Sequence, residues 1–158
     1  MKRRLILWLN LSAWFLLLGG IIFDQILSAN WKSGKIEDID NMKAFYHVTN
    51  PGYYFIPVKF PVLIFSIVSL ISFWKISKTV RLLLMIVTTT IITDLTFSAY
   101  HFDPIIMYTS GSNIDPIIAQ QKATSFYTFN FLRILLDLFG VCIAALALHK
   151  SYLRKSDL

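Results

Sequence analysis

The chain has 158 residues, of which 56% are hydrophobic and only 15% are charged, and its mean hydropathy is +0.61. This composition is too apolar for a small soluble domain and indicates an integral membrane protein. The formal net charge of +6 does not indicate nucleic-acid binding, because the basic residues gather in short clusters at the ends of apolar runs, as they do in membrane proteins.

The first apolar run covers residues 5–27 and follows the basic residues Lys2, Arg3 and Arg4. At about 1.5 Å per residue, it is long enough to cross a hydrocarbon core of about 30 Å. The alternative is a cleaved signal peptide, but the run is longer than the apolar part of such signals and is followed by a poor cleavage site. One stripe of this span predicts close helix contact, because it carries small and polar residues: Asn10, Ala13, Leu17, Gly20 and Asp24.

The remaining elements alternate between apolar spans and polar connections. Residues 28–50 are polar and are predicted to hold a short helix around residues 38–46. Pro51 and Gly52 break any helix that would continue from this connection into the next span. The second span, residues 52–74, is joined by a short basic loop to the third span, residues 79–100, so these two spans form an antiparallel hairpin. Residues 102–125 are turn-rich and predict an outer loop, and the fourth span covers residues 126–148.

These elements predict an all-α membrane protein, in which residues 1–158 form a single integral membrane domain with the fold of an antiparallel four-transmembrane-helix bundle. Nine Lys and Arg residues lie on the side that holds both termini, and four lie in the opposite loops. This bias predicts cytoplasmic N- and C-termini, and we expect a bacterial inner membrane as the location and membrane lipid as the surrounding partner. The single cysteine, Cys142, excludes dithiol redox chemistry.

Four charged side chains fall inside the spans at similar depths. Counted from the cytoplasmic side at about 1.5 Å per residue, Asp137 lies about 18 Å, Asp94 about 21 Å, and Arg133 and Lys59 about 24 Å into the membrane. An unpaired charge near the bilayer centre costs about 2.5–3.5 kcal/mol, whereas paired charges can stay ionised. The spacing therefore predicts one polar network inside the bundle, with Asp24 at its outer rim.

The last span carries its polar residues Asn130, Arg133 and Asp137 on a single stripe. Two interpretations of this stripe remain open. The first is structural: buried ion pairs fix the register of the helices, with an in-helix pair between Arg133 and Asp137 as the simplest form. The second is a functional pocket, because intramembrane ionisable residues are functional candidates.

A ring of polar and aromatic residues at the outer ends of spans two to four supports the functional interpretation: His47, Asn50, Tyr53, Tyr54, Tyr100, His101 and Tyr127. The tyrosines alone fit an interfacial aromatic belt. The histidines are not explained by such a belt, and an imidazole exchanges protons near neutral pH. His47 and His101 could hold a haem, or could join Asp103 around a metal, but they lack the spacing of a metal motif, so we expect no metal and no cofactor.

Three short motifs carry a resemblance to a known family. The Asn50-Pro51 step precedes the aromatic Phe55 at the start of the second span, and residues 93–104 form a threonine-rich end of the third span that closes near Pro104. The fourth span opens on an aromatic-Asn-Arg pattern, Tyr127-x-x-Asn130-x-x-Arg133. Together they resemble the anthrone oxygenase-like family of small four-span membrane proteins, although a tyrosine stands where a tryptophan is expected.

This resemblance implies a membrane oxidoreductase, by analogy with family members that insert oxygen into phenolic anthrones. The only residues to which the resemblance assigns a functional role are Asn50, Asn130 and Arg133. On this hypothesis a lipophilic phenol enters from the outer leaflet, Arg133 stabilises the phenolate, and the anion meets oxygen directly. The proton passes to His47, Asp94 or His101. The expected substrate-binding residues are Asn50, Tyr54, Lys59, Tyr100, Asn130 and Asp137.

The alternative is a non-enzymatic membrane protein. A four-helix bundle that binds lipid or a small molecule, or one that is a subunit of a larger complex, would also have large apolar faces and buried ion pairs. The sequence identifies no partner protein.

Overall fold

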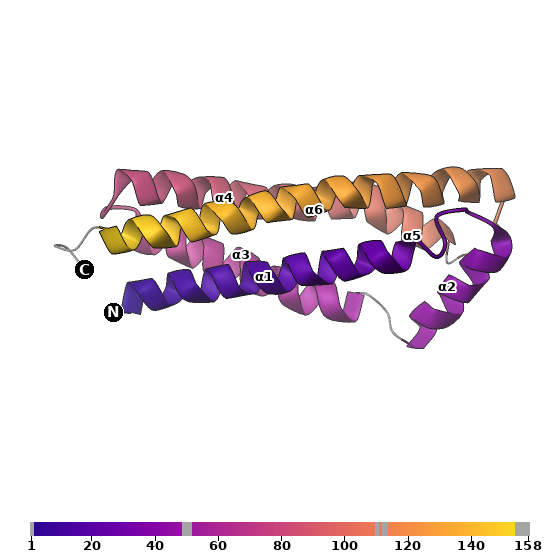
Figure 1. The fold of residues 1–158 in the computed structure, drawn as a ribbon, viewed down its shortest axis with the longest axis horizontal. Coiled ribbons are helices and arrows are strands. Elements are labelled where there is room, and N and C mark those ends of the chain that lie inside the picture. Colours follow the sequence, from indigo (N-terminus) through magenta and orange to yellow (C-terminus); the bar gives the residue numbers. More distant parts are fainter. Residues whose placement is uncertain (1, 49–51, 110, 112–113, 154–158) are drawn as a thin grey trace.

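The computed structural model describes residues 2–48, 52–109, 111 and 114–153. All regular secondary structure in the described residues is helical: α1 (Lys2–Ser28), α2 (Ile36–Val48), α3 (Gly52–Phe73), α4 (Lys78–Phe97), the π-helix η1 (Ser98–Phe102), α5 (Asp103–Thr109) and α6 (Pro116–Leu153). Four long helical segments run alongside one another, and α1 begins at the end of the bundle where α6 finishes (Figure 1). We call this the terminal end, and the opposite end the α2 end.

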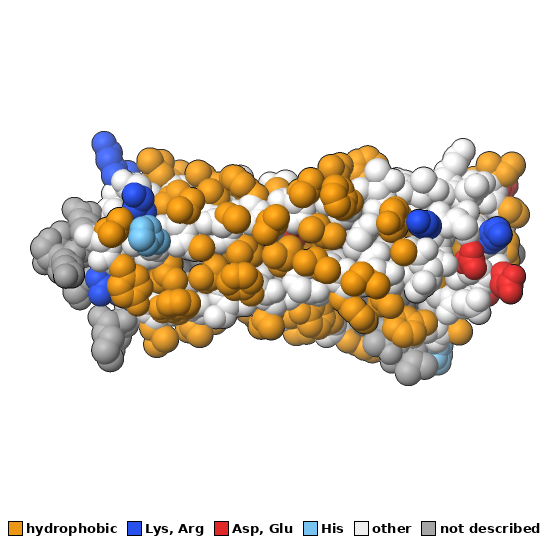
Figure 2. Space-filling view, viewed as in Figure 1, with side chains coloured by type: hydrophobic (Ala, Val, Ile, Leu, Met, Phe, Trp, Pro, Cys, Tyr) orange, Lys and Arg blue, Asp and Glu red, His pale blue; other side chains and the backbone are white. Residues whose placement is uncertain are grey.

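Four helical segments in the described part of the chain are long and apolar enough to cross a membrane: Arg3–Ser28, Tyr53–Phe73, Lys78–Thr109 and Pro116–Leu153. Hydrophobic side chains cover the middle of the visible face, whereas the charged side chains gather at its two ends (Figure 2). Such a band is the surface that lipid tails cover. The chain is therefore an all-α integral membrane protein, as the sequence predicted, and the expected short helix is α2.

The sequence-based prediction was wrong about residues 102–125, which were expected to form an outer loop. The third span continues through η1 into α5, and α6 begins at Pro116, ten residues before the expected start of the last span. The wider turn of the π-helix allows the N–H of Asp103 to bond to the carbonyl of Ser98, so the helix passes Pro104 without a break. At 38 residues, α6 is about 57 Å long and extends beyond the hydrocarbon core.

The second Asp-Pro pair begins a helix and does not mark a loop. The Oδ1 atom of Asp115 accepts hydrogen bonds from the N–H groups of Ile117 at 2.8 Å and Ile118 at 3.2 Å. Pro116 stands at the first helical position, where the N–H group that proline lacks has no helical acceptor. Asp115 is therefore the N-cap of α6.

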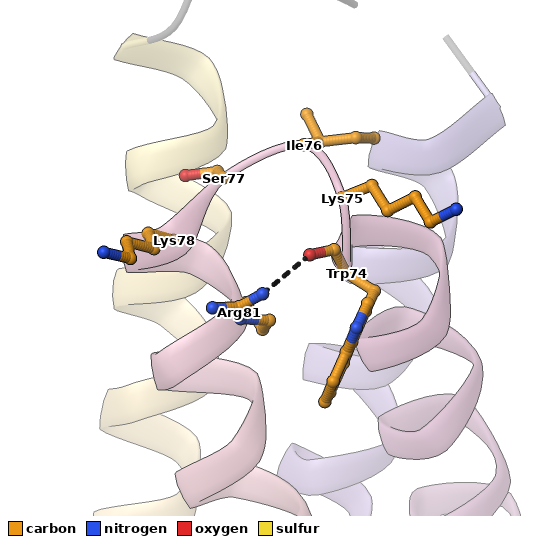
Figure 3. A pocket seen from close by; sticks show the side chains of 6 residues that line it. All are labelled: Trp74, Lys75, Ile76, Ser77, Lys78 and Arg81. Carbon is orange, nitrogen blue, oxygen red and sulfur yellow. Dashed lines mark hydrogen bonds between the residues drawn. The ribbon is translucent and has the colours of Figure 1, made fainter.

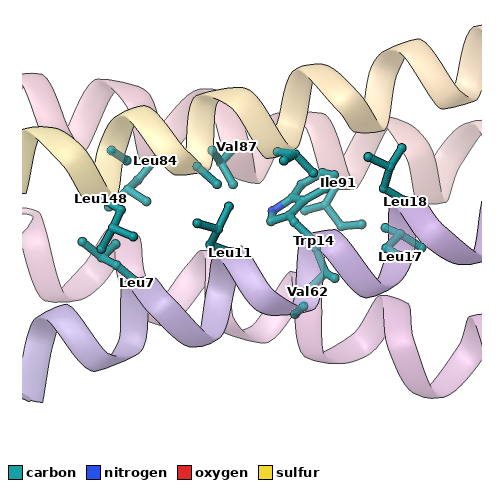
Figure 4. Close-up of a cluster of buried hydrophobic side chains, with 14 of the residues drawn as sticks. Leu7, Leu11, Trp14, Leu17, Leu18, Val62, Leu84, Val87, Ile91 and Leu148 are labelled. Atoms are coloured by element: carbon teal, nitrogen blue, oxygen red, sulfur yellow. The ribbon is translucent and has the colours of Figure 1, made fainter.

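Two apolar cores fill the bundle. The first lies along the transmembrane part, where α1, α3, α4 and α6 meet around residues such as Trp14, Leu17, Val62, Leu84 and Ile91 (Figure 4). The second lies at the α2 end, and its buried side chains are Trp31, Ile39, Met42, Phe102, Ile105, Ala119, Ala123 and Phe126. The residues 102–125 become helical because they supply a large part of this second core.

Two glycines allow aromatic rings to approach a helix backbone. A Cβ atom on Gly20 would lie 2.0 Å from the ring of Tyr54, and one on Gly140 would lie 2.5 Å from the ring of Trp14. These contacts join α1 to α3 and α1 to α6. The predicted small-residue stripe on α1 is thus a packing surface, and Asn10, Ala13, Leu17 and Asp24 on the same stripe are buried.

Candidate functional site

Three helices each contribute one charged side chain to a buried group that we call the charge network: Lys59 from α3, Asp94 from α4 and Arg133 from α6. The Nε atom of Arg133 donates a hydrogen bond of 2.6 Å to Oδ1 of Asp94, and Nζ of Lys59 lies 3.0 Å from Oδ2 of the same carboxylate. Asp94 is fully buried, and the two cations are also buried. Three of the four charges that the spacing placed in one network are therefore joined directly, whereas Asp137 makes no ion pair among the described residues.

The lysine of this network is held by a second contact. Lys59 donates a hydrogen bond of 2.6 Å to Oγ of Ser98, and that hydroxyl donates one of 2.8 Å to the carbonyl of Asp94. Ser98 opens the π-helix, one turn after Asp94. Both partners of Lys59 thus come from the same stretch of backbone, which fixes α3 against the end of α4.

Aromatic rings cover the arginine of the network. The guanidinium carbon of Arg133 lies 5.2 Å from the ring centre of Phe55 and 5.2 Å from that of Phe102. A guanidinium between aromatic faces is stabilised by their negative π-faces and is kept from water. Its one hydrogen bond within the described residues is the bond from Nε to Asp94, so the terminal amino groups donate none there.

The polar stripe on α6 continues on both sides of Arg133 with groups that lack partners. Asn130 and Asp137 have fully buried side chains. Within the described part of the chain, no hydrogen bond reaches the amide oxygen or nitrogen of Asn130, or either carboxylate oxygen of Asp137. The expected in-helix pair between Arg133 and Asp137 does not form among these residues, because Arg133 pairs across the bundle with Asp94.

Asp24 completes the set of buried charges. Its side chain is buried on α1, and the attractive Coulomb interactions acting on it come from Arg133 and Lys59. The same two cations attract Asp137. Three carboxylates from α1, α4 and α6 therefore share two cations, and among the described residues only Asp94 pairs with them directly.

His101 lies in the π-helix among aromatic rings. Its imidazole stacks on Phe97 with 5.3 Å between ring centres, and it meets the edge of Phe129 at 4.5 Å. Its Nε2 atom lies 3.4 Å from Oγ of Ser125. His101 also contacts Phe102 at 5.2 Å, and Phe102 in turn covers Arg133. The imidazole is therefore one ring away from the charge network.

The other expected site residues lie farther out or have another role. The Tyr54 hydroxyl donates a hydrogen bond to the carbonyl of Leu16, so this residue joins α3 to α1. Tyr100 is 83% exposed, and His47 is exposed in the last turn of α2. Asn50 lies outside the described residues.

The histidines were candidates for a metal centre. Among the residues that the structure describes, no group of three or more His, Cys, Asp or Glu side chains is placed to hold a metal ion. The proposed set of His47, His101 and Asp103 therefore does not assemble there. The expectation of no cofactor, and its alternative of a haem between His47 and His101, stay untested.

A pocket of about 280 Å³ opens at the α2 end between the end of α1 and α2, lined by Leu27, Asn30, Trp31, Asp38, Asn41, Met42 and Phe45. From its wall a series of ring contacts leads inward. Trp31 packs on Phe126 at 4.8 Å, Phe126 meets Phe102 at 5.0 Å, and Phe102 covers Arg133 at 5.2 Å. Aromatic side chains thus connect the outer pocket to the charge network.

Sequence reasoning gave no role in the network to three residues that shape it: Phe55, Ser98 and Phe102. Ser98 carried a usable signal, because it stands four residues after Asp94 on the same stripe. The two phenylalanines carried none, since the chain has 13 of them and only the packed bundle selects those that face Arg133.

Comparisons with protein-family models, with curated proteins and with solved structures found no match to this chain. The fold and the geometry of the site are therefore the basis for the functional inference.

Proposed function

We propose that the charge network and the α6 stripe bind a lipophilic hydroxylated aromatic molecule, and that the protein is a membrane oxidoreductase acting on such a phenol. The observation that supports this proposal most strongly is the set of buried polar groups without protein partners. Asn130 and Asp137 are fully buried on this stripe, and within the described residues no hydrogen bond reaches the polar atoms of either side chain. Arg133 lies between them and donates its hydrogen bond to Asp94 through Nε.

Buried polar groups in folded proteins nearly always have a hydrogen-bond partner, so a cluster of such groups needs an explanation. A ligand with a hydroxyl or carbonyl oxygen would accept from Arg133, and the amide of Asn130 can both donate and accept. The rings of Phe55 and Phe102 beside the guanidinium match a flat aromatic body. The ligand chemistry that fits is an aromatic ring bearing oxygen.

The roles in the proposed oxidation follow from the contacts. The guanidinium of Arg133 stabilises the phenolate, because a cation in a low-dielectric site favours the anionic form of a phenol. Both oxygens of Asp94 already contact cations, whereas those of Asp137 have no partner among the described residues, so Asp137 is the proposed proton acceptor. His101 is a second acceptor, one ring away. The anion then reacts directly with dioxygen, as the resemblance to anthrone oxygenase-like proteins implies. For an anthrone, dioxygen is the four-electron oxidant: one of its atoms becomes the new quinone carbonyl oxygen, and the other leaves as water with the two hydrogens of the ring CH2 group.

The alternative function is based on a different observation. Asp94 joins α4 to both α3 and α6 through direct contacts, which is the arrangement expected if the network only holds the helices in register. The protein would then be a non-enzymatic bundle that binds lipid or serves as a subunit of a complex.

Oxygen uptake by purified protein with a phenolic anthrone separates the two functions. The variants are Asn130→Ala and His101→Ala, and the matched control is Thr128→Ala, which alters an exposed polar residue on the same helix. We expect both variants to lose at least tenfold in oxygen uptake while their melting temperature stays within a few degrees of the unmodified protein, and the control to keep full activity. An unmodified protein that neither consumes oxygen nor is stabilised by the anthrone under nitrogen would favour the non-enzymatic function.

A further inference from the structure

The terminal end of the bundle has a second concave site, formed where the chain turns from α3 into α4. A pocket of about 430 Å³ opens there, lined by Trp74, Lys75, Ile76, Ser77, Lys78 and Arg81 (Figure 3). Three of its six lining residues are cations. This site lies at the start of α4, whereas Asp94 of the charge network lies near the end of the same helix, and the two sites share no residue.

The positive charge of this turn has no acidic counterpart nearby in the sequence. No Asp or Glu occurs between residues 41 and 93, and the first carboxylate of α4 is Asp94, about four turns farther along the helix. α1 begins and α6 finishes at this end of the bundle (Figure 1), so Arg3 and Arg4 in the first turn of α1 and Lys150 in the last turn of α6 add further cations there. The pocket therefore favours an anion from outside the protein.

Arg81 is held in place inside the pocket. Its Nη1 atom donates a hydrogen bond of 3.2 Å to the carbonyl of Trp74, and its guanidinium lies 5.2 Å from the centre of the Trp74 ring. Figure 3 shows Arg81 reaching across the turn to Trp74, while Lys75 and Lys78 extend outward on two sides. A guanidinium fixed through one amino group still offers donors on the other, in the fork geometry that matches phosphate oxygens.

The start of α4 adds backbone donors to the pocket. The hydroxyl of Ser77 accepts from the N–H of Val80 at 3.3 Å and caps the helix. The N–H groups of Lys78 and Thr79 belong to the first turn, where N–H groups have no acceptor within the helix. They strengthen the preference of the pocket for an anion but do not define it alone.

The depth of the pocket identifies the source of the anion. The 22 residues of α3 span about 33 Å, close to the thickness of the hydrocarbon core, so the turn that follows Phe73 lies at the level of the lipid headgroups. Trp74 is half exposed, as expected for an indole at the membrane interface. We propose that this pocket binds the phosphate group of an anionic membrane lipid, with Arg81 as the central contact and Lys75 and Lys78 at its sides.

Native mass spectrometry of the full chain tests this proposal, with phosphatidylglycerol and phosphatidylcholine as competing lipids in the detergent. The variant is Lys75→Gln/Lys78→Gln/Arg81→Gln. The matched control is Lys32→Gln/Lys35→Gln/Lys122→Gln, which removes the same charge from the α2 end. We expect the unmodified protein and the control to retain phosphatidylglycerol in preference to phosphatidylcholine, and the pocket variant to bind phosphatidylglycerol at least tenfold less. Equal losses in both variants would overturn the proposal, since they would show a response to net charge alone.

Two further arms keep the test decisive. The single variant Arg81→Gln removes the central contact with the least change to the turn, so its loss of phosphatidylglycerol with an unchanged melting temperature supports the site even if the triple variant does not fold. Inorganic phosphate at millimolar concentration is the third arm. Displacement of the lipid by inorganic phosphate at equal concentration would overturn the assignment to a lipid and identify a site for the free ion.

Discussion

Asp94 is the central residue of the charge network, because within the described residues it is the one carboxylate that pairs with both buried cations. Removing it would leave Lys59 and Arg133 without that direct anionic partner, and an unpaired buried charge is among the most destabilising features of a protein. Asp24 and Asp137 differ from Asp94, since they feel the same cations only at a distance. The interior therefore contains one carboxylate in direct ion pairs and two, Asp24 and Asp137, without an ion pair among the described residues.

The buried amide of Asn130 allows a test of this division. Because its side chain has no hydrogen bond within the described residues, Asn130→Leu should change the melting temperature little or raise it. Asn10 is the matched control: it is also buried, but its oxygen accepts a hydrogen bond of 3.0 Å from Ser66. Asn10→Leu should therefore cost about 1–3 kcal/mol, since it leaves the Ser66 hydroxyl unpaired.

Thermal unfolding in detergent measures both variants. If Asn130→Leu destabilised the protein as much as Asn10→Leu, the amide of Asn130 would have partners in the folded protein, and the proposed binding role of the α6 stripe would lose its main support.

The helices show what the sequence could predict. The four spans and the short α2 helix follow from the length of apolar runs and from breaker residues, which are local signals. The two Asp-Pro pairs were misread, because the same pair fits a turn and the first turn of a helix. At residues 103–104 a π-helix absorbs the proline, and at residues 115–116 the aspartate caps a new helix. The helical form of these two segments is stabilised by packing against Trp31 and Ile39, which the local sequence does not show.

Helix packing at Gly20 leads to a second test. A methyl group on Gly20 would collide with the Tyr54 ring, whereas one on the neighbouring Gly19 would meet no packing partner within 4 Å among the described residues. Gly20→Ala should therefore destabilise the contact between α1 and α3 by about 1–3 kcal/mol. Gly19→Ala should stabilise the protein by about 0.5–1 kcal/mol, because alanine is the better helix former.

Unfolding of the two glycine variants under identical detergent conditions gives the comparison directly. Equal stability of Gly19→Ala and Gly20→Ala would contradict the close packing of Tyr54 on α1. The hydrogen bond from Tyr54 to Leu16 should weaken in Gly20→Ala alone, and amide hydrogen exchange on α1 would report the change.

The molecule has an apolar core in its transmembrane part and an aromatic core at the α2 end. The charge network connects the two. The depth of Lys59, Asp94 and Arg133 could be predicted from residue counting, because helical rise is constant. Which cation pairs with which carboxylate could not, since that depends on helix rotation and on the rings of Phe55 and Phe102. The outer ring of tyrosines was predicted from position alone, and packing places Tyr54 against α1 and leaves Tyr100 exposed.

A double-mutant cycle on Asp94 and Arg133 measures whether α4 and α6 are joined through the buried ion pair. Asp94→Asn should cost about 3–5 kcal/mol of unfolding free energy, because it leaves the buried cations Arg133 and Lys59 without their carboxylate. Arg133→Gln should cost less, about 1–3 kcal/mol, because Asp94 keeps its contact with Lys59. The double variant should lose less than the sum of the two, by about 0.5–3 kcal/mol. The same cycle on the partly exposed pair Asp40 and Lys43 should give about 1 kcal/mol or less. Strictly additive losses at Asp94 and Arg133 would contradict a direct pair inside the bundle.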